Sequence, residues 1–312
     1  LEGLLGGRDL DFVFLCVASE ATPRWLRDLA AREVAVLVET PLATRLGALR
    51  DLVRELPADA RIQSAEQYRF QPQHAARLEV ARGGLIGTPA SVRVSAAHFY
   101  HVVSLVRAAL GVALERARIH AQAFPDVVTS SLGRDGWAAS TSRETIERVI
   151  ATIEFPDLGA LAVYDFTESQ YFSPIRSRHL SIAGESGEVA DDTVHVLAGP
   201  GEPLRLELRR DSTGTDGDLE GSFLRRITLG ERVVYTNPLA PARLSDDEIA
   251  IGTVLLGMTR FARGGEPLYG IADAAEDQYL SLLIRESIES GTPVETGERG
   301  WSGAASVLGW LR

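Results

Sequence analysis

Two histidines and a tyrosine lie within four residues of one another, at His98, Tyr100 and His101. An imidazole exchanges protons near neutral pH, so a histidine held beside a substrate hydroxyl can act as a general base. A single histidine in an apolar stretch is more often a core residue whose ring is satisfied by a hydrogen bond, and that interpretation stays open. The clustering of the three side chains favours proton-transfer chemistry.

A helix over residues 97–111 must position this cluster. Its apolar residues recur at helical spacing and form one stripe, at Val102, Leu105, Val106 and Ala109. Gly111 is a suitable C-terminal stop. His101 then falls in the first turn, where the positive end of the helix disfavours protonation and leaves a neutral imidazole able to accept a proton.

A second polar motif, Glu39-Thr40-Pro41, closes the apolar run of residues 34–38. Proline fixes the turn and biases Thr40 toward an extended backbone. The threonine hydroxyl can hydrogen-bond a substrate oxygen, but it cannot donate a proton as a cation near neutral pH. All 32 basic residues are arginine, so the chain has no lysine base or Schiff base. A turn without a function is the alternative.

The first 86 residues alternate between strand-like and helical segments. We expect strands at residues 12–17, 34–38 and 61–64, and helices at residues 23–32, 43–56 and 72–82. The first run is almost continuously apolar and includes Cys16, which predicts a strand buried on both faces. This pattern is half of a doubly wound parallel sheet, in which ligands bind at the carboxyl ends of the strands. Ser19 and Thr22 follow the first strand, where a plain helix cap is the alternative.

After Gly87 the polarity changes to period two. We expect strands at residues 91–96, 149–155, 160–166, 180–182, 194–197 and 204–208, a hairpin turn at residues 156–159, a capping box at Ser245 and a helix at residues 273–290. The predicted fold is therefore α/β, with a partial Rossmann-type parallel sheet followed by an α+β part with a large, mainly antiparallel sheet. We place the dinucleotide-binding domain at residues 1–86 and a substrate and oligomerisation domain at residues 87–312, with its C-terminal helices packing back on the first.

Three segments together resemble the Gfo/Idh/MocA family of sugar and polyol oxidoreductases, in their order and in short motifs. They are Glu39-Thr40-Pro41, Gln67-Tyr68-Arg69-Phe70 and residues 97–107. The resemblance implies hydride transfer between NAD or NADP and a sugar or cyclitol hydroxyl. The chain departs from the family at two positions: Thr40 stands at the family's lysine, and Ala97 stands at the acid four residues before the histidine.

The resemblance also implies roles for single residues. His101 would be the base, Tyr100 its helper and Thr40 the group that orients the hydroxyl. The cofactor-binding residues would be Ser19, Thr22, Glu39, Pro41 and Gln67. Arg69 would bind substrate. In residues 165–179, Tyr171 and the paired arginines Arg176 and Arg178 also suit the binding of a polyol or an acid as substrate; solvated arginines at a sheet edge are the alternative. The histidines show no metal-ligand spacing.

Composition limits the partners. A net charge of −11 argues against a nucleic-acid backbone, and no stretch approaches the ~18 apolar residues of a membrane span. A single cysteine fits a cytoplasmic protein. The family relation implies a homo-oligomer formed through the C-terminal sheet.

The family's glycine fingerprint would lie about 60 residues earlier, two βα units before the first strand. Gly3-Leu4-Leu5-Gly6-Gly7 cannot replace it, because its spacing is wrong and no strand precedes it. We therefore expect this chain to bind NAD or NADP with a Kd weaker than ~1 mM. A non-catalytic binding or scaffold protein, and a lyase or hydrolase that uses NAD transiently, remain alternatives.

Overall fold

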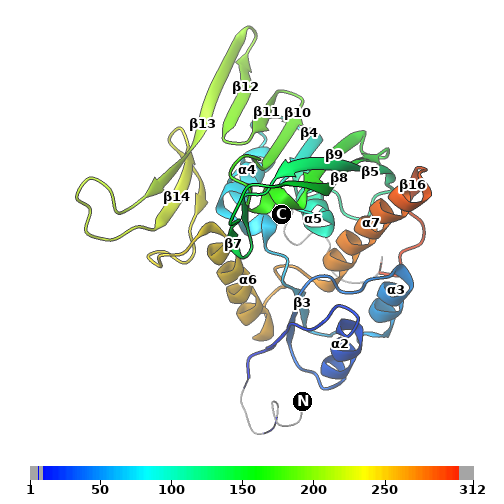
Figure 1. The fold of residues 1–312 in the computed structure, drawn as a ribbon. Helices are drawn as coiled ribbons and strands as arrows, with labels where there is room; N and C mark the ends of the chain where they lie inside the picture. Colours follow the sequence, from blue (N-terminus) through cyan, green and yellow to red (C-terminus); the bar gives the residue numbers. More distant parts are fainter. Residues whose placement is uncertain (1–5, 7–9, 302–312) are drawn as a thin grey trace.

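The computed structural model describes residue 6 and residues 10–301. Its first part is a small parallel sheet in the order β1-β2-β3, which lies with the helices α2 and α3 near the N-terminal end of the molecule (Figure 1). The elements are β1 (Val13–Leu15), α2 (Thr22–Ala31), β2 (Val36–Val38), α3 (Leu46–Glu55), β3 (Ile62–Ser64), the 3-10 turn η1 (Tyr68–Phe70) and α4 (Pro72–Arg82). The predicted alternation of strand and helix is confirmed. Most of the Gly3–Gly7 run lies outside the described residues.

The first strand differs from the prediction. β2 is buried throughout, but β1 leaves Phe14 47% exposed, and Cys16 lies after the strand and is also exposed. β1 pairs only with β2 among the described residues, so it is an edge strand whose outer side meets solvent. The expectation of a strand buried on both faces, with Cys16 inside it, is wrong for that reason.

The second part is an eleven-stranded sheet in the order β15-β14-β13-β12-β11-β10-β4-β9-β8-β5-β16. Its strands are β4 (Pro89–Ser95), β5 (Arg118–Thr129), β8 (Arg143–Phe155), β9 (Ala160–Thr167), β10 (His179–Gly184), β11 (Gly187–Ala190), β12 (Thr193–Gly199), β13 (Glu202–Ser212), β14 (Leu224–Leu229), β15 (Arg232–Thr236) and β16 (Val294–Glu295). Only β4 and β9 pair in parallel. A separate two-stranded ribbon joins β6 (Leu132–Gly133) to β7 (Gly136–Trp137). The expected mainly antiparallel sheet is confirmed.

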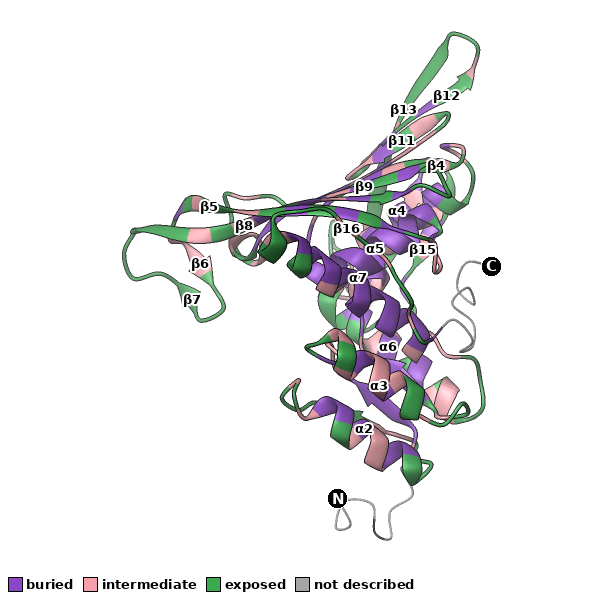
Figure 2. Ribbon diagram, turned by 90° about the vertical axis from the view of Figure 1, so that its right-hand side faces the viewer, coloured by how far each residue is buried: buried purple, intermediate pink, exposed green. Residues whose placement is uncertain are grey.

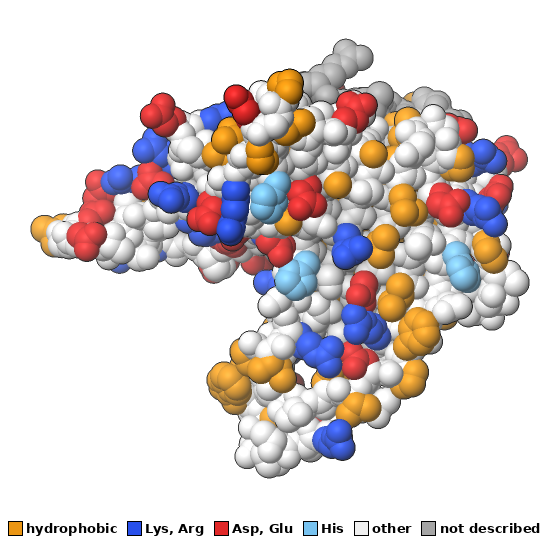
Figure 3. All heavy atoms as spheres, turned by 90° about the horizontal axis from the view of Figure 1, so that it is seen from above, with side chains coloured by type: hydrophobic (Ala, Val, Ile, Leu, Met, Phe, Trp, Pro, Cys, Tyr) orange, Lys and Arg blue, Asp and Glu red, His pale blue; other side chains and the backbone are white. Residues whose placement is uncertain are grey.

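One face of this large sheet is covered. Helices α4, α5 (Phe99–Leu110) and α7 (Ile271–Ser290) lie on the same side of it (Figure 2). Alternation within the strands follows from this arrangement, because Val149 and Ile153 of β8 are buried whereas Ile150 is 37% exposed. On the opposite face, apolar, acidic and basic side chains are interspersed (Figure 3).

The helix α6 (Asp246–Ala262) joins the two sheets. The predicted capping box is present, with Ser245 and Glu248 bonding reciprocally. The Gln63 side chain of β3 donates to the Val254 carbonyl of α6 and accepts from the Leu268 backbone N–H. Most buried apolar residues of both sheets and of α5 and α7 form one core. A second, smaller cluster packs Ala35 and Leu37 at β2 against Val254 and Met258 of α6.

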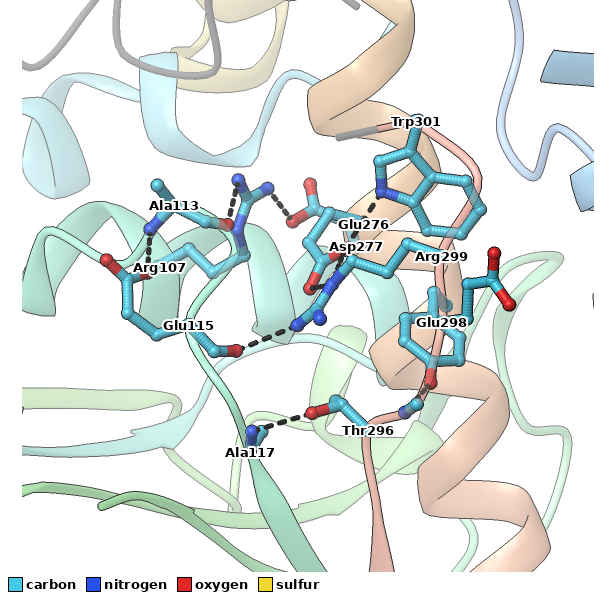
Figure 4. Close-up of polar contacts among 12 residues, drawn as sticks. Arg107, Ala113, Glu115, Ala117, Glu276, Asp277, Thr296, Glu298, Arg299 and Trp301 are labelled. Carbon is cyan, nitrogen blue, oxygen red and sulfur yellow. Dashed lines mark hydrogen bonds and ion pairs between the residues drawn. The ribbon is translucent and has the colours of Figure 1, made fainter. Parts of the chain in front are cut away.

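An ion-pair network fixes α5 to α7. The Arg107 guanidinium is 1% exposed and donates to Asp277 Oδ1 at 2.7 Å (Figure 4). It also donates to Asp273 Oδ1 at 3.0 Å. Beside it, Arg299 and Trp301 both donate to the Glu276 carboxylate. These contacts fix the direction of α5, whose first turn carries the histidine and tyrosine cluster.

Candidate active site

Three polar segments meet at the carboxyl ends of the parallel strands. Glu39-Thr40-Pro41 follows β2, Glu66 and Gln67 follow β3, and His98 is the N-cap of α5, with Tyr100 and His101 in its first turn. In open α/β sheets this edge is where ligands bind. The fold therefore brings side chains from distant segments together at the carboxyl edge of the parallel sheet.

A carboxylate contacts the central histidine. Nδ1 of His101 lies 2.6 Å from Oε2 of Glu66, and both side chains are buried, at 9% and 2% exposure. A neutral imidazole that donates from Nδ1 to this carboxylate keeps Nε2 as its acceptor. Glu66 Oε1 accepts the backbone N–H of Tyr68. The geometry thus suits the tautomer in which Nε2 can accept a proton.

Tyr100 connects the histidine to Thr40. Its ring centroid lies 4.3 Å from that of His101, and its hydroxyl is hydrogen-bonded to the Thr40 side chain. Thr40 in turn donates from its backbone N–H and its hydroxyl to Glu39 Oε1, at 3.0 and 3.2 Å. Burial raises the pKa of Tyr100, and the Thr40 hydrogen bond partly opposes this. The tyrosine thus remains a hydrogen-bond donor at neutral pH.

His98 faces a different partner. Its Nδ1 is 2.6 Å from the Tyr171 hydroxyl, which also accepts the His98 backbone N–H at 2.9 Å. Burial lowers the pKa of His98 to about 4, so its ring is neutral over the physiological range. The expected substrate-binding residue Tyr171 is therefore hydrogen-bonded to the protein, and it also bonds Tyr68.

Phe99, between His98 and Tyr100, has a φ angle of +40°. Non-glycine residues rarely adopt this region, and such strain concentrates at functional sites. The Phe99 ring is held by the Arg285 guanidinium, 3.8 Å from the ring centroid. The strained residue starts the helix that carries both Tyr100 and His101.

A cavity of about 10 Å³ lies next to this cluster, lined by Thr40, Pro41, Leu42, Ser64, Glu66, Tyr100, Tyr269, Ala274, Asp277 and Gln278. It has room for about one water-sized group. Burial raises the pKa of Asp277 to about 6, against the opposing effect of Arg107. Thr40, Tyr100 and Glu66 therefore share one cavity wall with residues of α7.

The remaining expected cofactor residues lie at the same edge. Ser19 is in the turn after β1, and Thr22 is the first residue of α2 and is buried. Gln67 is the N-cap of η1 and is half-buried. Pro41 lines the cavity. No side-chain cap is formed at the start of α2, so the alternative of Ser19 or Thr22 as a plain helix cap is not what the structure contains.

The two expected substrate arginines lie elsewhere. Arg69 is 3% exposed, donates to the Leu268 carbonyl at 2.8 Å and lies 4.0 Å from the Tyr269 ring centroid. Burial lowers its pKa to about 9. Arg176 forms a two-pronged contact with Asp126 of β5. Neither side chain lines the cavity beside His101.

Glu66 is the residue that sequence reasoning missed. The resemblance implies an acid four residues before His101, where Ala97 stands and offers no carboxylate. Glu66 lies 35 residues earlier, yet its carboxylate reaches the ring. The sequence feature that could have identified Glu66 is its position directly after a buried strand that ends at the ligand-binding edge of the sheet.

Two further observations concern metals and membranes. Within the described part of the chain, no group of three or more His, Cys, Asp or Glu residues could hold a metal ion. Among the same residues, no helix is long and apolar enough to cross a membrane.

The sequence matches no protein-family model, and no curated protein matches it. Solved structures do share its fold. An oxidoreductase domain protein from Kribbella flavida has a TM-score of 0.64 at 18% identity, over 95% of this chain and 83% of the other. A myo-inositol dehydrogenase from Corynebacterium glutamicum has a TM-score of 0.61 at 14% identity, over 96% and 84%. A levoglucosan dehydrogenase, solved with NADH and levoglucosan, has a TM-score of 0.62 at 16% identity, over 95% and 83%.

Proposed function

We propose that this protein is an NAD(P)-dependent oxidoreductase that acts on a hydroxyl or carbonyl of a sugar, cyclitol or related polyol. The observation that carries the proposal is the Glu66–His101 pair beside Tyr100 and Thr40, at the carboxyl edge of a parallel sheet. The fold supports it, because solved proteins that share it include dehydrogenases named for myo-inositol and levoglucosan. The same substrate class follows from the resemblance to the Gfo/Idh/MocA family.

The chain's own residues supply the acid–base chemistry. His101 accepts the proton of the substrate hydroxyl at Nε2, because Nδ1 is committed to Glu66. Glu66 holds the ring orientation and stabilises the imidazolium that forms, as the acid does in other histidine pairs. Tyr100 and Thr40 orient the substrate oxygen through their hydroxyls. A lysine is unnecessary in this arrangement.

The residues fit one end of the cofactor. Polar groups at three successive strand ends, from Ser19 to Thr40 and Gln67, suit the nicotinamide and ribose. A nicotinamide held by these residues would supply the hydride chemistry at the substrate carbon. The described residues contain no glycine-rich loop between a strand and a helix for the pyrophosphate, which accounts for the expected Kd weaker than ~1 mM.

A non-catalytic binding protein is the second candidate. Two observations favour it: threonine stands at the family's lysine position, and the cavity beside Thr40 holds only one water-sized group. Such a protein would keep the fold and the buried Glu66–His101 pair as a structural contact.

The deciding experiment replaces Glu66 by glutamine. NAD(P)H formation is followed by absorbance with inositols and other polyols at saturating cofactor. If Glu66 orients the base, Glu66→Gln lowers turnover at least tenfold and shifts the pH profile of kcat/KM. Glu79→Gln is the matched control, since Glu79 forms an exposed ion pair with Arg232. Equal rates in both variants, or no turnover by the parent chain, would favour the binding protein.

A further inference from the structure

Four buried oxygen atoms of the cavity-lining residues have no hydrogen-bond partner within the described protein. They are Ser64 Oγ, Tyr269 Oη, Asp277 Oδ2 and Gln278 Oε1. Their residues are 0%, 1%, 3% and 5% exposed. Buried polar atoms are almost always paired, because an unpaired one is destabilising. Four such atoms around one cavity indicate a bound group.

The side chains that line the cavity indicate the charge of the bound group. Among the described residues that line the cavity, two are carboxylates, Glu66 and Asp277, and none is basic. The other polar side chains offer hydroxyl or amide oxygens. Oxygen atoms in this combination are the ligands of hard cations, as in sites where they replace a hydration shell.

The number of unpaired carboxylate oxygens in the cavity limits the charge of the bound cation. Glu66 uses Oε2 for His101 and Oε1 for the Tyr68 backbone, and Asp277 uses Oδ1 for Arg107. One carboxylate oxygen, Asp277 Oδ2, is left without a partner. A divalent ion needs more negative charge or its own waters, and the cavity of about 10 Å³ has no room for a hydrated ion.

We propose that this cavity binds a single monovalent cation, Na⁺ or K⁺, coordinated by Ser64, Tyr269, Asp277 and Gln278. The cation adds to Arg107 in compensating the buried Asp277 carboxylate, through the Oδ2 atom that Arg107 leaves unpaired, and ties the end of β3 to α7. It lies behind Thr40 and Glu66 and does not take part in the proton transfer. The proposal is independent of whether the protein is an oxidoreductase.

The test measures thermal unfolding of the full chain in NaCl, KCl or choline chloride at constant ionic strength. We expect the unfolding midpoint to rise saturably with Na⁺ or K⁺ and not with choline, because only a bound ion stabilises the folded state by mass action. Tyr269→Phe removes one ligand and should weaken the apparent affinity about tenfold. Tyr235→Phe is the matched control, since its hydroxyl also lacks a partner but lies outside the cavity.

A third variant and a structure complete the test. Thr40→Lys places a tethered ammonium beside the cavity and should abolish the dependence on Na⁺ or K⁺. Crystals of the parent chain soaked in thallium(I) should give an anomalous peak between Asp277 and Gln278. Identical midpoints in all three salts, or a water with no anomalous signal, would overturn the proposal. Activity is not the readout, so failure here leaves the oxidoreductase proposal standing.

Discussion

At the scale of single residues, the proposed acid–base site combines His101, Tyr100 and Thr40 with the Glu66 carboxylate from another part of the chain. The resemblance to the Gfo/Idh/MocA family puts Thr40 at a lysine position and Ala97 at an acid position, and the carboxylate that contacts His101 is instead that of Glu66, which follows β3.

The first prediction concerns the two histidines. His101→Ala should lower turnover by roughly 10² to 10⁴, the usual contribution of a general base. His98→Ala should cost less, because His98 bonds Tyr171 and not Glu66. Steady-state rates on a responsive polyol, with circular dichroism to confirm folding, measure both. A folded His101→Ala protein with an unchanged rate would eliminate the histidine mechanism.

The second prediction introduces at Thr40 the lysine that the resemblance to the Gfo/Idh/MocA family implies for this position. In Thr40→Lys the new ammonium would lie beside the Glu66 carboxylate and near Tyr100, which bonds Thr40 in the parent chain. If the site keeps the family's geometry, activity should rise or its pH profile should shift, because a cationic proton donor has been added. Thr44→Lys, at an exposed position after the same strand, is the control. An identical effect of both lysines would show that the change is only one of net charge.

At the scale of elements, local sequence patterns predicted most strands and helices but not the contacts between them. The period-two segments became β4, β8, β9, β10, β12 and β13, and the stripe from Val102 became α5. β5 was not predicted, because both faces of its outer half, around Phe124 and Pro125, are exposed and its polarity does not alternate. The Glu66–His101 contact joins elements 35 residues apart, and no local periodicity reports that.

The third prediction concerns the joint between α5 and α7. Arg107→Met leaves the buried carboxylates of Asp273 and Asp277 without their guanidinium. The loss should be about 3–5 kcal/mol of unfolding free energy, as for other broken buried ion pairs. Arg210→Met removes an exposed pair with Asp246 and should cost at most about 1 kcal/mol. Urea unfolding of both variants measures the difference. Similar losses would mean that burial does not increase the contribution of the Arg107 ion pairs to the free energy of unfolding.

The fourth prediction concerns His74 on α4. Burial lowers its pKa to about 3, whereas an unfolded histidine titrates near about 6.5. Between these values only the unfolded chain binds the proton, so stability is lost as the pH falls through that range. His74→Gln should remove this component and reduce the pH slope of the unfolding free energy by up to about 1.4 kcal/mol per pH unit. Parallel slopes for parent and variant between about pH 6 and pH 4 would contradict the assignment.

At the scale of the whole molecule, the fold class could be predicted, because the change from helical to period-two polarity near Gly87 is visible in the sequence. The C-terminal helices were expected to pack back on the first domain, but the side-chain contacts that hold them there, such as Gln63 with Val254, could not be predicted, since they join segments far apart in the sequence. The sequence-based prediction of a homo-oligomer requires that a second copy packs against the open face of the large sheet. Its apolar residues include Phe124, Ile150 and Leu161, which are 42%, 37% and 38% exposed.

The fifth prediction tests that face. If a second copy packs against it, Ile150→Asp should shift the protein toward the monomer, because the carboxylate would be buried without a partner. Leu158→Asp is the control, since Leu158 is equally apolar but lies in the hairpin turn between β8 and β9. Sedimentation velocity over a range of concentrations measures both. A parent chain that is monomeric at all concentrations would remove the oligomer prediction.

The exposed position of Cys16 makes this protein easy to label at one place. It is the chain's only thiol, and it lies directly after β1, before the turn that carries Ser19 and leads to Thr22 at the start of α2. A maleimide fluorophore would therefore attach at a single site without any prior mutagenesis. Its emission would report directly on whether a nucleotide approaches that edge of the sheet, even in a protein that turns nothing over.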